Sequence, residues 1–322
     1  MSRLVEPLSR RARVAGGDGP AYEGARRGHA RGALYRSASR RSVGRSDLAS
    51  APVLLLPLDA GVYAWLTDPP GRGRPNAGAV VDADGVTVID TLMTPDQYGP
   101  FAAALDELGL PVRRAVLTGS GVEQAGGTGR FPLAAVYGSP QASVHLDQPP
   151  NVDSWVALYP GHDADFDEVV TRPVSHVVAS DVQLTDAVAV LTTGGQMAEN
   201  LVAVVPGAQI LFAGAMCSFR ATPLCWQGDP RRWADELDRL VGLAPIVVPG
   251  HGPVGGEEEV RDLQAYLRAC VAAGGDPARL GPGPWEAWTD REHDAVNVER
   301  AALLAAGDDA VPPSMLRLAG LE

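Results

Sequence analysis

The chain has 322 residues, of which 45% are hydrophobic and 20% charged, a composition typical of a globular protein that can bury a sizeable core. Residues 1–50 carry 11 arginines and 4 acids, a charge of +7, whereas the rest of the chain carries 16 arginines and 35 acids, a charge of −19. A body this acidic repels a phosphate backbone, so nucleic acid is excluded as an expected partner.

Residues 1–48 are rich in Arg, Gly, Ser and Ala and have almost no periodic apolar pattern. This composition predicts a disordered Arg-rich N-terminal arm. Two other interpretations stay open, namely an over-long translation start and a basic arm that docks an anionic partner. Regular structure is expected to begin near Val53.

The first elements predicted after the arm are two pairs of strands. Strands are predicted over residues 54–58 and 62–66, and again over 77–82 and 86–90. The dipeptide Asp84-Gly85 between the second pair is a strong signal for a hairpin turn.

A helix, a strand and a glycine-rich segment are predicted next. Thr94 and Pro95 suit the cap and the first position of a helix. The apolar face of this helix has helical spacing and consists of Tyr98, Phe101, Ala102, Leu105 and Leu108. A short buried strand over residues 114–118 leads into the glycine-rich segment 119–127.

In the second half of the chain, strands followed by helices are predicted again. Its predicted strands span residues 187–191, 201–205, 210–213 and 246–248, and its predicted helices begin at Pro230 and Glu257. Short outer helices are expected beyond Asp276. Strands and helices in both halves predict an α/β fold, an αββα sandwich of two facing mixed β-sheets with helices on the outer faces.

The cysteines and the hydropathy of the sequence indicate the cellular compartment in which the protein is expected. Cys217, Cys225 and Cys270 form no C-x-x-C pair and leave an odd count, so we expect no disulfide framework and a cytoplasmic protein. No apolar run approaches the roughly 18 residues that a membrane helix needs, so no membrane contact is expected.

Four segments, in this order, resemble the metallo-β-lactamase superfamily: residues 86–91 (VTVIDT), 117–127 (LTGSGVEQAGG), 196–215 (QMAENLVAVVPGAQILFAGA) and 248–252 (VPGHG). The resemblance covers residues 53–270 and implies the αββα fold. It divides the chain into the arm, residues 1–48, and one domain, residues 49–322. In that domain residues 53–270 form the core and 271–322 a C-terminal helical extension.

The resemblance also locates the positions at which this superfamily binds its metals. Members carry T-H-x-H-x-D-H-x-x-G after the third core strand, a histidine in the next landmark, an aspartate or cysteine after L-F-x-G, and a last histidine in PGHG. In this chain those positions hold, in order, Gly119, Gly121, Glu123, Gln124, Gln196, Ala215 and His251.

These replacements remove most of the expected ligands. The first metal would need Gly119, Gly121 and Gln196, of which two have no side-chain donor and the third is a neutral amide. The second would keep only Glu123 and His251, which leaves a weak single-metal site as a minor alternative. We therefore expect no metal cofactor, and we do not expect a zinc-dependent hydrolase.

Three functions stay open at this point. The first is a non-hydrolytic pseudoenzyme that binds a small molecule or a protein in the cleft between the sheets. The second is a metal-independent isomerase, cyclase or dehydratase in which Glu123 and His251 form an acid–base pair. There Gln124, Gln196 and Ser120 would bind substrate. Residues 297–300 (NVER) add a resemblance to actinobacterial members described as cyclases. The third is a residual metallohydrolase.

The remaining histidines and the tryptophans have less specific interpretations. His145, His162, His176 and His293 lie outside the ligand positions and are interpreted as surface or packed side chains. Trp226, Trp233, Trp285 and Trp288 could line the mouth of a cleft, although packing is the commoner role of such aromatic residues.

Overall fold

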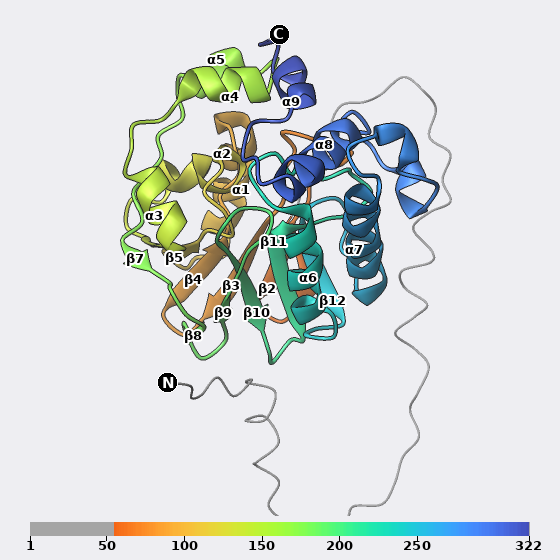
Figure 1. Cartoon of the computed structure of the whole chain (residues 1–322). Coiled ribbons are helices and arrows are strands. Elements are labelled where there is room, and N and C mark those ends of the chain that lie inside the picture. Colours follow the sequence, from red (N-terminus) through yellow and green to blue (C-terminus); the bar gives the residue numbers. More distant parts are fainter. Residues whose placement is uncertain (1–54, 322) are drawn as a thin grey trace, which may run out of the picture. The chain divides into compact units, whose positions relative to one another are not determined.

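The computed structural model describes residues 55–321, apart from the side chains at positions 163 and 164. The arm expected over residues 1–48 lies outside these described residues. The described chain forms two β-sheets with helices on their outer faces (Figure 1). This arrangement confirms the αββα sandwich expected from the order of strands and helices.

The first sheet contains seven strands in sequence order from β1 to β7. The first four pair antiparallel, and β4 to β7 pair parallel, so the C-terminal ends of β4, β5 and β6 share one edge. The strands are β1 (Leu56–Asp59), β2 (Val62–Trp65), β3 (Ala77–Asp82), β4 (Gly85–Ile89), β5 (Val112–Val116), β6 (Ala135–Gly138) and β7 (His176–Val177).

The second sheet contains five strands in the order β12-β11-β10-β9-β8. All neighbours pair antiparallel except β11 and β12, which are parallel. The strands are β8 (Val182–Gln183), β9 (Ala189–Thr193), β10 (Asn200–Val205), β11 (Ile210–Ser218) and β12 (Ile246–His251).

Apolar side chains fill three layers between and outside the sheets. Helix α1 (Pro95–Asp106) buries Phe101 and Leu105 against the first sheet. Helices α6 (Pro230–Leu240), α7 (Glu257–Ala272) and α8 (His293–Ala305) cover the second sheet in one apolar cluster that includes Trp233. The layer between the sheets is built from small β-branched and aliphatic residues of both.

Phe212 of β11 packs against Gly78 of β3 in the interior between the sheets. A Cβ atom at Gly78 would lie 2.2 Å from Cε1 of Phe212. Because no side chain fits in that space, glycine lets the buried phenyl ring fill the interior between the sheets.

Shorter elements gather at the edge where β5 and β12 end. They are α2 (Val122–Ala125), the 3-10 helix η2 (Gly126–Arg130), α3 (Pro140–Leu146), α4 (Val152–Leu158) and α5 (Asp163–Phe166). Figure 1 shows α4 and α5 at one end of the sandwich, beyond α2. The C-terminal extension adds two 3-10 turns (Pro277–Arg279 and Pro284–Ala287), α8, and α9 (Pro313–Leu318).

Several boundaries differ from the expected ones. Asp82 pairs with Gly85, so the β3–β4 turn is Ala83-Asp84 and not Asp84-Gly85. Strand β5 ends at Val116, two residues before Thr118, and β11 continues to Ser218. None of the helices within residues 55–321 is long and apolar enough to span a bilayer.

Candidate functional site

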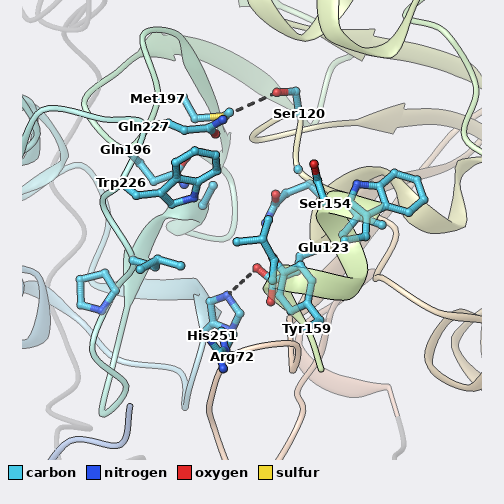
Figure 2. A pocket seen from close by; sticks show the side chains of 18 of the residues that line it. Arg72, Ser120, Glu123, Ser154, Tyr159, Gln196, Met197, Trp226, Gln227 and His251 are labelled. Atoms are coloured by element: carbon cyan, nitrogen blue, oxygen red, sulfur yellow. Dashed lines mark hydrogen bonds and ion pairs between the residues drawn. The ribbon is translucent and has the colours of Figure 1, made fainter. Parts of the chain in front are cut away.

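A cavity of about 460 Å³ opens at the edge where the two sheets end. It is lined by the segments that follow β2, β5 and β11, by the end of β12, and by α4 (Figure 2). This volume lies in the range of small-molecule sites, about 300–1,000 Å³.

Two charged side chains meet on the wall of this cavity. The Glu123 Oε2 atom lies 3.3 Å from the Nε2 atom of His251, and both residues line the cavity (Figure 2). Glu123 comes from α2, which follows the first sheet, and His251 is the last residue of β12 in the second sheet. Their side chains are 13% and 18% exposed, so the pair is largely desolvated yet still reachable from the cavity.

Further hydrogen bonds fix both partners of the pair. Glu123 Oε1 accepts from the backbone N–H of Gly73 at 2.8 Å, and the Tyr159 hydroxyl also bonds to the carboxylate. His251 Nδ1 donates to the backbone carbonyl of Arg74 at 3.2 Å. The pair therefore joins α2, β12, the residues after β2 and the end of α4.

The environment favours the charged form of both partners. Burial alone raises the pKa of Glu123, but the charge of His251 and the bonds from His251, Gly73 and Tyr159 outweigh it, so the net shift is downward. Burial alone lowers the pKa of His251, but Glu123 and the Arg74 carbonyl outweigh it, so the net shift is upward. Burial and Glu123 raise the pKa of Tyr159 well above its usual range, so this hydroxyl stays protonated and donates.

A second buried network lies behind the cavity wall. The Asp90 carboxylate accepts from the backbone N–H of Thr118 at 2.8 Å and from its hydroxyl at 2.6 Å. The same hydroxyl accepts from the backbone N–H of Ala215 at 2.9 Å. Burial raises the pKa of Asp90 to about 7, although the Thr118 bonds act to lower it. Asp90 thus fixes Thr118, whose hydroxyl in turn connects the residues after β5 to β11.

The positions that would hold the first metal do not fit one. A Cβ atom at Gly121 would lie 2.8 Å from Oε1 of Gln124, and a Cβ at Gly119 would lie 3.5 Å from the same atom and 3.4 Å from Cβ of Ala215. Side chains at these glycines would therefore point at one small space, which the Gln124 amide now occupies. An amide oxygen and a methyl group are not zinc donors of the usual kind.

Gln196, at the third position of the first metal site, uses its side chain for a hydrogen bond within the protein. Gln196 Oε1 accepts from Nδ2 of Asn200 at 3.1 Å, and that nitrogen also donates to the Thr118 carbonyl at 3.1 Å. For the second metal only Glu123 and His251 supply suitable atoms. Across residues 55–321, no group of three or more His, Cys, Asp or Glu side chains is arranged to hold a metal ion.

Most of the residues expected at the site do converge. The cavity is lined by Ser120, Gly121, Glu123, Gln124, Gln196, Ala215 and His251. Gly119 lies directly behind this lining, within van der Waals reach of Gln124 and Ala215. The structure therefore brings these residues together in one cavity.

Other residues of the cavity were not expected from the sequence. Trp155 lies in α4, Tyr159 lies at its end, and Arg72 lies in the segment after β2. His145 is exposed and His293 is buried, as predicted for surface or packed side chains, and both also line the cavity. No sequence pattern marks them, because they come from separate segments that only the fold brings together.

Of the four tryptophans considered for the cleft, Trp226 is partly exposed on the cavity wall. Trp233 also borders the cavity, but it is 1% exposed and packs in the apolar cluster that covers the second sheet. Trp285 and Trp288 instead pack against Tyr266, with ring centroids 5.8 Å and 5.4 Å apart. Packing is therefore the observed role of the last two.

Comparison with solved structures identifies the fold. The DIM-1 metallo-β-lactamase is 15% identical, with a TM-score of 0.53, and the match covers 66% of this chain and 96% of that one. FIM-1 from Pseudomonas aeruginosa, in its mono-zinc form, is 18% identical, with a TM-score of 0.52 over 67% and 95%. The enzyme from Erythrobacter litoralis is 17% identical, with a TM-score of 0.52 over 66% and 95%.

No protein-family model and no curated protein sequence matches the chain. At these identities the structural likeness establishes the fold alone. The chain has the metallo-β-lactamase fold.

Proposed function

We propose that this chain, with its metallo-β-lactamase fold, binds a small organic molecule in the cavity without a metal and is not a zinc-dependent hydrolase. The observation that carries the proposal is the Glu123–His251 ion pair, which stands where a metal would otherwise join the two sheets. Since the pair holds α2 and β12 together, the cavity keeps its shape without a cation.

The chemistry of the lining indicates what kind of molecule would fit. The amides of Gln124 and Gln196 offer hydrogen bonds at one side, and the partly exposed Trp226 and Trp155 offer flat apolar surface. A cavity with apolar walls and a few polar groups is typical of sites for small organic ligands. An aromatic or alicyclic compound with a carboxylate or amide group would match both features.

A second candidate function is metal-independent acid–base catalysis by the same pair. It is favoured by the position of Glu123 and His251 on the cavity wall, where each side chain keeps some exposure. The proton between Nε2 and Oε2 could then move to or from a bound substrate, as isomerisation or dehydration requires. Both nitrogens of His251 already have partners, however, so binding accounts for the geometry with fewer assumptions.

Thermal unfolding in the presence of a panel of aromatic carboxylic acids and amides would test the proposal. Each compound is measured in buffer with a chelator and again with added zinc. We expect at least one compound to raise the Tm equally in both buffers, because a ligand stabilises the state that binds it. Stabilisation by zinc alone, reversed by the chelator, would contradict the proposal.

Two variants locate the binding site. Trp226→Ala removes a partly exposed ring from the cavity wall, and Tyr137→Ala removes a partly exposed ring that stacks on His176 outside the cavity. The compound should lose its effect on the first variant and keep it on the second. For the second candidate function, His251→Ala should abolish any turnover found for a bound compound.

A further inference from the structure

A serine and a histidine that the proposed function does not use lie in contact on the cavity wall. The Ser120 Oγ atom lies 2.8 Å from the Nδ1 atom of His145, and both residues line the cavity. We propose that Ser120 is a nucleophile activated by His145, and that it accepts an acyl group from a carboxylic ester or thioester bound in the cavity. This inference goes beyond the proposed binding function and does not depend on it.

Ser120 stands at a turn that presents its hydroxyl to the cavity. It lies between the end of β5 and the start of α2, with Gly119 and Gly121 on either side. The sharp turn from a strand into a helix is a position at which a nucleophilic serine is accessible to a bound carbonyl. Figure 2 shows Ser120 joined by a dashed line to Met197, with Gln196 on the same side of the cavity as Met197.

His145 is placed to take the proton of that hydroxyl. It lies in the last turn of α3, and its side chain is exposed, so water reaches the ring nitrogen that faces away from Ser120. When Nε2 carries the ring proton, Nδ1 accepts the hydrogen bond from Ser120. The Met197 sulfur, 3.5 Å from the Ser120 oxygen, is a much weaker acceptor.

Backbone donors are available for the negative charge that the reaction creates. The amide N–H groups of Ser120 and Gly121 donate to no acceptor within residues 55–321. The N–H of the residue after a nucleophilic serine commonly stabilises the tetrahedral oxyanion. Gly121 holds that position here.

The proposed step balances without an additional reactant. Ser120 Oγ forms a bond to the acyl carbon of the ester or thioester while its proton passes to Nδ1 of His145. The bond from that carbon to the leaving oxygen or sulfur then breaks, and the leaving group takes the proton from His145. The products are an acylated Ser120 and an alcohol or thiol.

Two other serines of the chain provide matched controls. Ser154 lines the same cavity, but its contact is through its backbone N–H, to Asn151. Ser175 has a similar contact to a histidine, with Oγ 3.0 Å from Nδ1 of His176, but lies outside the cavity lining. Ser154 therefore tests the effect of the cavity when no histidine contact is given for the hydroxyl. Ser175 tests the effect of a histidine contact outside the cavity.

The experiment is covalent labelling of the full chain with an alkyl fluorophosphonate, followed by peptide mass spectrometry. A reactive serine displaces fluoride and forms a stable phosphonate ester, so no natural substrate is needed. We expect Ser120 to be labelled at least about tenfold faster than Ser154 or Ser175. The label on Ser120 should be absent in Ser120→Ala and unaffected by Ser154→Ala or Ser175→Ala.

Removing the base provides a second measurement. His145→Gln should slow the labelling of Ser120 by on the order of 10²-fold. Because His145 is exposed, this variant should fold normally, which its Tm would verify. Equal labelling of the three serines, or an unchanged rate in His145→Gln, would overturn the proposal. Neither result would affect ligand binding, which is measured separately by the Tm.

Discussion

The carboxylate of Glu123 lies 3.3 Å from the imidazole of His251 and joins the helix that follows β5 to the end of β12. In a two-sheet sandwich whose metal positions hold glycine, alanine and amides, this ion pair is a charged connection between the two sheets on the cavity wall.

Glu123→Gln should lower the free energy of unfolding by about 2–3 kcal/mol near pH 6, because it leaves a largely buried imidazolium without its counter-charge. The pKa of His251 is raised in the folded state, so its stabilisation is full below its unfolded value and is lost as the pH rises through the folded value. The difference between wild type and variant should therefore shrink from pH 6 to pH 9.

Urea unfolding at the two pH values measures this difference, and NMR titration of the ring nitrogens measures the pKa of His251 directly. That pKa should fall in Glu123→Gln. Glu123 itself, whose pKa is lowered, stabilises the fold above its unfolded value and loses that effect only in acid. A difference in stability that is the same at both pH values would argue against a charged pair.

Tyr159→Phe should loosen α4. The variant keeps the ring but removes the hydroxyl that bonds to Glu123, a loss of about 1 kcal/mol. Amide exchange in residues 152–158 should accelerate about fivefold as a result. Tyr63→Phe, at a partly buried position of strand β2, is the control and should leave α4 unchanged. Equal exchange in both variants would mean that Tyr159 does not hold the helix.

Gly78→Ala should destabilise the sandwich by about 1–3 kcal/mol or more, since its methyl group would enter the space of the Phe212 ring. In the Phe212→Leu background the same substitution should cost less, because the smaller side chain makes room. Urea unfolding of the two single variants and the double variant gives the coupling. Strict additivity would show that the two sheets are not in contact at this point.

Asp90→Asn should change how stability depends on pH. Folded Asp90 stays protonated up to about pH 7 whereas the unfolded chain ionises near its ordinary value, so stability falls as the pH rises between these values. Across this pH range the fall in the free energy of unfolding amounts to up to about 4 kcal/mol, at about 1.36 kcal/mol per pKa unit. Because asparagine cannot ionise, this fall should be absent from the variant. Asparagine also tolerates the positive φ of 58° at this position.

Unfolding free energies from pH 4 to pH 8 would measure the effect. The exposed Asp106→Asn, whose partner Arg130 is also exposed, is the matched control and should follow the wild-type profile. Parallel profiles for wild type and Asp90→Asn would mean that Asp90 is ionised throughout.

The sequence predicts the sandwich because its core elements carry regular apolar patterns. Strand β5 stops earlier than expected because Thr118, which continues the apolar run, gives its N–H to the Asp90 side chain and its carbonyl to Leu201 of the other sheet. Such a contact between distant segments leaves no mark on the local pattern.

The cavity could be predicted only in part. Glu123 and His251 occupy positions that the superfamily resemblance relates to one metal, so their approach follows from the sequence. The position of Tyr159 could not be predicted from the sequence. Helix α4, which ends beside it, has no buried residue and therefore no amphipathic pattern that would indicate a helix. The role of α8 was also missed, since the extension was expected only on the outside, whereas its His293 reaches the cavity lining.

Elemental analysis of the untagged protein, purified without added metal or chelator, tests the central claim most directly. A wall built from Glu123, His251, glycines and amides should retain only traces of zinc, iron or manganese after dialysis. Stoichiometric metal that leaves only with a strong chelator, and that is lost in His251→Ala, would contradict the account.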